Sequence, residues 1–298
     1  MSITADEIAT QPELWRRAIE QAGEVADLLP ARGKEVCVVG CGTSLYMAQA
    51  WARLREQAGH GRTDAYPASE LPAGRRYDVL VAISRSGTTS EVTRVLERRP
   101  ADRSVAITAV ADGPVGAAAN EVIALPYADE RSVVQTRFAT TALTLLRAHA
   151  GDGGNAVADA ERALTMDLPI DPAQVTQWTF VGRGWTVGLA HEAALKLREA
   201  AQAWTEAYPA LEYRHGPISV SGPGGVVWSF GPTDPALAEE MRATGATVVD
   251  LRQDPLSSLV VAQRTAVALA RAKGLDPDLP RHLSRSVVLA GQALNTLS

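Results

Sequence analysis

The chain has no apolar run of the roughly 20 residues that a membrane-spanning helix requires, although 46% of its 298 residues are hydrophobic. It also has no excess of basic residues, because 34 aspartates and glutamates outnumber 29 lysines and arginines. The first absence argues against a membrane protein, and the second argues against nucleic acid as the main partner. Residues 1–15 are polar and acidic, which is unlike a signal peptide. We therefore expect a cytoplasmic, globular protein.

Cysteine is scarce, since only Cys37 and Cys41 occur. They lie beside a predicted strand end, and no second cluster of cysteine and histidine could complete a zinc site with them. We interpret both as small hydrophobic side chains in a reducing compartment. The sequence thus indicates no metal site and no bound cofactor.

Segments of strand and helix type alternate along the chain. Predicted strands over 34–39, 78–83 and 105–110 are separated by predicted helices over 44–58 and 90–98, after a helix over 11–29. The segment 78–83 is apolar throughout, as in a strand covered on both faces. The alternation predicts an α/β protein with a parallel, doubly wound sheet.

The pattern repeats in the second half of the chain. Residues 38–42 recur as residues 180–184, each time closing an apolar strand, and the strand over 79–84 has a counterpart over 226–230. Two related α/β halves are expected, one over 1–165 and one over 166–298. Near their boundary, predicted helices over 132–149 and 156–165 flank a glycine-rich stretch.

Two turns rich in glycine, serine and threonine follow predicted strands. The first, Gly40-Cys41-Gly42-Thr43-Ser44, lacks the third glycine and the later acidic residue of a dinucleotide site, so NAD is not indicated. The second carries four hydroxyls, on Ser84, Ser86, Thr88 and Thr89. These hydroxyls fit phosphate binding. Helix capping is the alternative, although it explains only one or two of them.

A predicted helix over 186–203 carries two stripes at helical spacing. One stripe is apolar and is expected to face the core: Ala193, Leu197, Ala200 and Trp204. The other, about 100° away, consists of Glu192, Lys196 and Glu199. A solvated Glu-Lys pair is the ordinary interpretation of the second stripe.

Downstream of this helix, Glu206, Glu212 and His215 add further ionisable side chains. His215 alone could be a turn residue with a structural hydrogen bond. Taken together with Lys196 and Glu199, these residues have the composition of an acid/base centre. With the phosphate turns, they indicate an enzyme that moves protons on a sugar phosphate.

The whole set resembles the SIS (sugar isomerase) family, most closely the isomerase half of glucosamine-6-phosphate synthases. The resemblance covers about residues 35–290. The matching segments are C-G-T-S at 41–44, I-S-R-S-G-T-T at 83–89, G-R-G at 182–184, E-A-A-L-K-L-R-E at 192–199, E-A-Y at 206–208, E-Y-R-H-G-P at 212–217 and D-L-P-R-H-L-S-R-S-V at 278–287. It implies two SIS subdomains, each a flavodoxin-like parallel sheet flanked by helices.

The resemblance also implies roles for single residues. Glu199 matches the base that moves a proton between carbons 1 and 2, and Lys196 matches a residue that steadies the developing enediolate oxygen. His215 matches the acid/base that opens the sugar ring, reaching the site from the neighbouring subunit of a homodimer. The expected substrate-binding residues are Cys41, Gly42, Thr43, Ser44, Ser84, Arg85, Ser86, Thr89 and Arg285.

Two departures from the synthase pattern limit the chemistry. Only about 35 residues precede the first SIS strand, so we expect no glutaminase activity. Arg285 stands where the synthase has a lysine that forms a Schiff base, and a guanidinium cannot form that imine. The sequence does not explain Arg85 and Thr88, which stand where the synthase has glutamine and glutamate.

Enolisation at carbon 2 leaves three hypotheses open. With an N-acetylhexosamine 6-phosphate, the enolate can expel the hydroxyl on carbon 3, and we favour this dehydratase reaction. With glucosamine 6-phosphate, returning the proton to carbon 1 leads to isomerisation and deamination. The third hypothesis is a sensor that binds a sugar phosphate without turnover.

Overall fold

The computed structural model describes residues 2–152 and 154–289, so residues 290–298 of the second predicted half lie outside it. The chain forms two compact units that interleave in sequence. The first-sheet unit consists of residues 14–131, 137–152 and 284–289. The second-sheet unit consists of residues 2–13, 132–136 and 154–283. No helix within the described ranges is long and apolar enough to cross a membrane.

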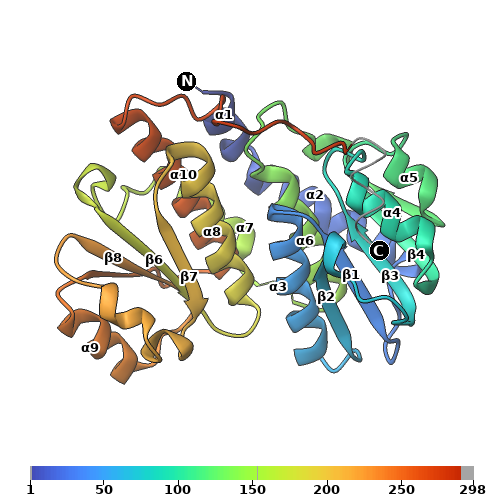
Figure 1. Ribbon diagram of the computed structural model, residues 1–298, viewed down its shortest axis with the longest axis horizontal. Helices are drawn as coiled ribbons and strands as arrows, with labels where there is room; N and C mark the ends of the chain where they lie inside the picture. Colours follow the sequence, from blue (N-terminus) through green and yellow to red (C-terminus); the bar gives the residue numbers. More distant parts are fainter. Residues whose placement is uncertain (1, 153, 290–298) are drawn as a thin grey trace. The chain divides into compact units, whose positions relative to one another are not determined.

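The first-sheet unit is built on five parallel strands in the order β2-β1-β3-β4-β5. Its strands are β1 (Val36–Gly40), β2 (Thr63–Pro67), β3 (Tyr77–Ile83), β4 (Ala101–Thr108) and β5 (Glu121–Ala124). Its helices are α3 (Thr43–Gln57), α4 (Ser90–Arg98), α5 (Pro114–Ala118), α6 (Arg137–His149) and most of α2 (Gln11–Glu24). Helices α4 and α5 pack on one face of the sheet, and α3 and α6 lie on the other (Figure 1).

The second-sheet unit repeats this plan with four parallel strands in the order β7-β6-β8-β9. Its strands are β6 (Gln177–Gly182), β7 (Thr205–Pro209), β8 (Gly225–Phe230) and β9 (Thr247–Asp250). Its helices are α1 (Ile3–Ala9), α7 (Ala156–Thr165), α8 (Thr186–Ala201), α9 (Pro235–Ala243) and α10 (Pro255–Ala272). Helix α8 packs against α10 and the sheet, and α9 covers the opposite face (Figure 1). The predicted fold class of two helix-flanked parallel sheets is confirmed.

The internal repeat is visible in two equivalent glycines at strand ends. A Cβ atom on Gly40 would lie 2.6 Å from the backbone carbon of Ser44, and one on Gly182 would lie 2.3 Å from the carbonyl oxygen of Thr186. Either contact is too close for a side chain, so each helix can pack against its strand only over glycine. These glycines therefore serve packing in both units.

Some predicted helices are shorter than expected: the helix predicted over 11–29 ends at Glu24, and a short 3-10 turn at Ala26–Leu28 follows it. The helix predicted over 132–149 begins only at Arg137, and residues 132–136 are non-helical. The hydroxyl and the backbone N–H of Ser132 both donate to the Glu7 carboxylate. These bonds hold the segment in the second-sheet unit, and the β-branched Val133 and Val134 favour an extended backbone.

Candidate active site

The two hydroxyl-rich turns follow adjacent strands of the first sheet. β1 and β3 pair in parallel, with Val39 opposite Ala82, so the turns after them emerge at the same carboxyl edge. In the order 2-1-3-4-5 the chain's connections reverse direction between β1 and β3. Open parallel sheets bind ligands at such a reversal point. The structure thus brings residues 41–44 and 84–89 to the edge where a ligand site is expected.

The hydroxyls of these turns do not cap the helices that follow. Gly42, with a φ of 54°, occupies the N-cap of α3, and Thr89 occupies that of α4; neither makes a side-chain cap hydrogen bond. The capping alternative is therefore wrong for this chain. The first-turn N–H groups of α3 and the buried hydroxyls of Thr43 and Ser44 lie at the same helix end, a combination suited to an anion.

Cys41 stays neutral beside these hydroxyls. Burial, and next the nearby Glu91 carboxylate, raises the pKa of the Cys41 thiol to about 11. The thiol therefore remains protonated at neutral pH and does not repel an anion at this turn. Burial also raises the pKa of Cys37, to about 12, which fits the structural role predicted for it.

The hydroxyls of the second turn bond to one another. The oxygens of Ser84 and Thr89 lie 3.3 Å apart, and Thr88 donates to Ser86 Oγ from its hydroxyl (3.1 Å) and its backbone N–H (3.2 Å). Hydroxyl protons rotate freely between acceptors. The turn can therefore exchange these internal bonds for bonds to a phosphate oxygen.

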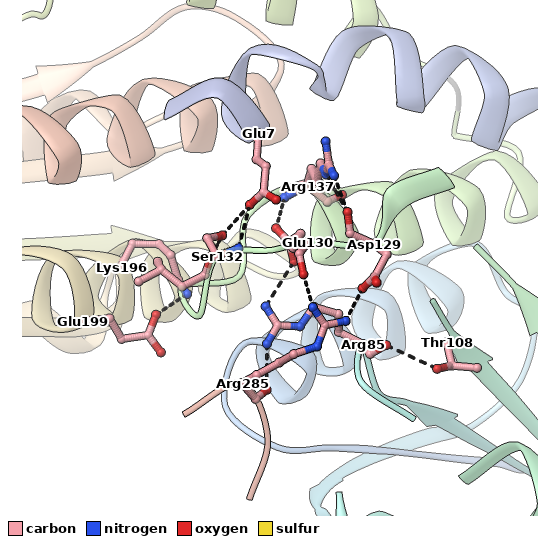
Figure 2. Close-up of polar contacts among 12 residues, drawn as sticks. Glu7, Arg85, Thr108, Asp129, Glu130, Ser132, Arg137, Lys196, Glu199 and Arg285 are labelled. Carbon is pink, nitrogen blue, oxygen red and sulfur yellow. Dashed lines mark hydrogen bonds and ion pairs between the residues drawn. The ribbon is translucent and has the colours of Figure 1, made fainter. Parts of the chain in front are cut away.

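Arg85 and Arg285 both face a short acidic segment (Figure 2). Arg85 Nη1 lies 3.6 Å from Glu130 Oε2, and both side chains are at most 1% exposed. Arg285 Nη2 lies 2.5 Å from Asp129 Oδ1, and Nη1 donates to the Glu130 carbonyl. Both guanidinium groups are thus engaged by protein carboxylates and carbonyls.

Lys196 and Glu199 form a cluster with Glu192 on helix α8 of the second-sheet unit. Lys196 Nζ lies 3.4 Å from Glu192 Oε1 and donates to Glu199 Oε2 (Figure 2). The side chains of Lys196 and Glu192 are 1% exposed, whereas that of Glu199 is 18% exposed. The solvated-pair interpretation is therefore wrong, because the pair is buried. Glu199 is the member of the cluster that a reactant can reach.

The other residues singled out around α8 lie apart from this cluster. Trp204, predicted to face the core, is 86% exposed, because α8 ends at Ala201 and Gln202 adopts a left-handed φ of 50°. The Glu206 carboxylate accepts bonds from Gln177 and Thr179, which gives it a structural role. His215 lies in an exposed turn after a short helix at Glu212–Arg214.

Sequence reasoning missed Asp129, Glu130 and Ser286, which contact the predicted site residues. Glu130 faces the buried Arg85, but no local pattern indicates which of the 34 acidic residues does so. Within residues 2–152 and 154–289, no group of three histidine, cysteine, aspartate or glutamate residues is arranged to hold a metal ion.

Comparison with known proteins finds a matching family model and relatives of similar sequence. A family model of the SIS domain matches residues 31–150. The glutamine--fructose-6-phosphate aminotransferase [isomerizing] of Methanothermobacter thermautotrophicus is 28% identical over 95% of this chain and 57% of its own length. The chain thus spans little more than half the length of the curated relatives that it matches.

Solved structures match the chain almost end to end. The glucosamine-6-phosphate deaminase from Thermotoga maritima superposes with a TM-score of 0.82 and 26% identity, covering 97% of this chain and all of the other. The C-terminal domain of glucosamine-fructose-6-phosphate aminotransferase from Francisella tularensis gives a TM-score of 0.80 at 21% identity, covering 94% and 98%. The second match supports the fold alone.

Proposed function

Residues 31–150 belong to the SIS domain family, and from that premise we propose that this chain is an enzyme that abstracts the carbon 2 proton of an open-chain amino-sugar 6-phosphate. The observation that carries the proposal is the contact of buried Lys196 with the more open carboxylate of Glu199. A sensor needs affinity for its ligand but no base, so a buried lysine held against an accessible carboxylate favours catalysis.

Each residue of the cluster has a proposed task. Glu199 takes the proton from carbon 2, next to the aldehyde. Lys196 contacts Glu199 and offers positive charge to the oxygen that becomes negative in the enediolate. Glu192, 3.4 Å from Lys196, limits the freedom of the ammonium group. The phosphate binds at residues 41–44 and 84–89.

The fate of the enolate depends on the nitrogen at carbon 2. When the nitrogen is acetylated, the carbonyl at carbon 1 re-forms, a double bond forms between carbons 2 and 3, and the bond from carbon 3 to its oxygen breaks. The departing hydroxyl takes up the proton that Glu199 removed and leaves as water. Arg285 favours this dehydratase reaction, because it cannot form a Schiff base and its guanidinium is held by Asp129 and Glu130.

Isomerisation and deamination of glucosamine 6-phosphate is the second candidate. Its support is the end-to-end similarity to the deaminase from Thermotoga maritima. In this reaction the proton returns to carbon 1, and the resulting imine at carbon 2 hydrolyses to a ketone and ammonium.

A proton NMR time course in deuterated water tests the proposal and separates the candidates. The protein is incubated with N-acetylglucosamine 6-phosphate and, separately, with glucosamine 6-phosphate. We expect a vinyl signal from the first substrate. Fructose 6-phosphate and ammonium from the second would instead establish the deaminase. Binding of both sugars with no loss of either carbon 2 proton would contradict an enzymatic function.

We also propose a homodimer in which His215 serves the neighbouring subunit. His215 lies in an exposed turn, and the same unit exposes Trp204 at 86%, Val220 at 55% and Leu211 at 46%. Exposed aromatic and aliphatic side chains of this size are typical of protein interfaces.

A complementation experiment tests the shared site. Glu199→Gln and His215→Asn are each expected to be almost inactive. When the two variants are mixed and allowed to exchange subunits, half of the dimers contain one of each, and one of their two sites has both native residues. Activity should then return to about a quarter of the wild-type value. If subunit exchange is verified and no activity returns, His215 serves the site of its own subunit.

A further inference from the structure

The end of the described chain lies along the second hydroxyl-rich turn, within the first-sheet unit. Residues 285–289, here called the C-terminal tail, contact residues 85–90. The contacts are Arg85 Nη2 to the Arg285 carbonyl (2.7 Å), Ser86 Oγ to Ser286 Oγ (3.1 Å), Thr88 Oγ1 to Ser286 Oγ (2.9 Å), Ser90 N to the Val287 carbonyl (3.3 Å) and Leu289 N to Ser90 Oγ (2.9 Å). The tail is thus bonded to the turn at four of its five residues.

Arg85 connects the interior of the unit to this tail. One arm of its guanidinium faces the buried Glu130 carboxylate at 3.6 Å, and the other donates to the Arg285 carbonyl at 2.7 Å. The planar fork of an arginine can satisfy two acceptors in this way, whereas the single ammonium of a lysine is less suited to do so. Arg85 therefore sets the position of the residue that precedes Ser286.

Ser286 adds a hydroxyl from the tail to two hydroxyls of the turn. The oxygens of Ser86, Thr88 and Ser286 lie 2.9–3.1 Å from one another and form a triangle. Each hydroxyl has one proton and can rotate it. Without a ligand the three groups can bond to one another, and with an anion present their protons can turn toward its oxygens.

From this geometry we propose that Ser286 is a further phosphate-binding residue and that Arg85 is the positioning residue that holds it there. The inference rests on the proposed function, because it assigns the phosphate to this turn. It also gives Arg85 and Thr88 roles that the sequence does not explain. Arg85 anchors the tail, and Thr88 contributes a hydroxyl to the triangle.

Ser286→Ala tests the first part of the proposal. Binding of inorganic phosphate and of glucosamine 6-phosphate is measured by calorimetry, with Thr247→Ala as the control, because it also removes a hydroxyl, at an exposed position on β9 of the other unit. We expect Ser286→Ala to raise both dissociation constants about tenfold or more, the usual worth of a hydrogen bond to a charged group. The control should stay within about twofold of wild type.

Arg85→Lys tests the second part, because it keeps a positive charge beside Glu130 but loses the fork. We expect a similar rise in both dissociation constants and faster hydrogen exchange at the amides of Ser90 and Leu289, which the tail contacts protect. Glucosamine without phosphate should bind the variant and the wild type equally weakly.

The outcomes separate this inference from the proposed function. Wild type that binds neither inorganic phosphate, nor glucosamine 6-phosphate, nor N-acetylglucosamine 6-phosphate overturns both. If the wild type and Ser286→Ala bind glucosamine 6-phosphate equally well, only the inference is overturned. Tighter binding by Ser286→Ala also overturns it, because the tail would then compete with the phosphate for the turn.

Discussion

Exchange of the carbon 2 proton with deuterated water should fall by about a hundred- to ten-thousandfold when Glu199 is replaced by Gln, because positioned general bases contribute that much to such steps. Glutamine keeps the shape of the side chain and can still contact Lys196, but its amide cannot accept the proton. The loss is measured by NMR on whichever substrate the wild type exchanges, N-acetylglucosamine 6-phosphate or glucosamine 6-phosphate.

The matched control is Glu239→Gln, which makes the same chemical change at an exposed position on α9 of the same unit. It should exchange the proton at the wild-type rate. The binding of substrate to Glu199→Gln is measured in parallel, so that lost affinity is not mistaken for lost chemistry. Exchange that persists at the wild-type rate in Glu199→Gln would assign the proton transfer to another group.

A loss of about 3–5 kcal/mol in the free energy of unfolding is expected when Arg85 is replaced by Met. The Glu130 carboxylate is fully buried, and its other oxygen already accepts the Arg137 backbone N–H at 2.8 Å. Without Arg85 the Glu130 carboxylate loses this ion-pair partner in a fully buried site, and removing one member of a buried pair has a cost of this size. Urea denaturation followed by circular dichroism measures it.

The double variant Arg85→Met with Glu130→Leu separates charge from packing. Replacing both members of a buried ion pair by apolar groups can be nearly neutral, so the double variant should recover about 2 kcal/mol or more of the summed single losses. The control, Arg76→Met, breaks the exposed pair with Asp102, whose side chains are 65% and 75% exposed. It should change stability by less than about 0.5 kcal/mol. Equal losses at Arg85 and Arg76 would contradict a buried pair.

Much of the fold could be predicted because it depends on local patterns. The helices over Ser90–Arg98 and Ala156–Thr165 have the predicted bounds, since apolar spacing marks them directly. Residues 132–136 could not be predicted, because their backbone is set by Ser132 donating to Glu7, 125 residues away. Trp204 continues the stripe of α8 in sequence, yet the helix stops three residues earlier.

The site divides in the same way between local and distant contacts. The hydroxyl-rich turns follow strands, and the order of parallel strands brings their ends together, so the sequence could indicate them. The sequence also indicated that Glu192, Lys196 and Glu199 share one face of a helix. It did not indicate that this face is buried, because periodicity predicts which residues share a face but not what packs against it. The contacts of Arg85 with Glu130 and of Ser86 with Ser286 join residues that no local spacing relates.

The interleaving of the two units bears on how the chain folds during synthesis. The Asp278 carboxylate accepts the backbone N–H groups of Ile3 and Thr4, so α1 acquires this anchor only after residue 278 has been made. At roughly 5–20 residues per second, a ribosome adds the 274 residues that follow Thr4, up to and including Asp278, in about 14–55 s. Throughout that time Ile3 and Thr4 lack this partner, and the first sheet is translated before Ser286, which bonds to the turn after β3. The second-sheet unit can therefore complete its native contacts only after residue 278 has been made.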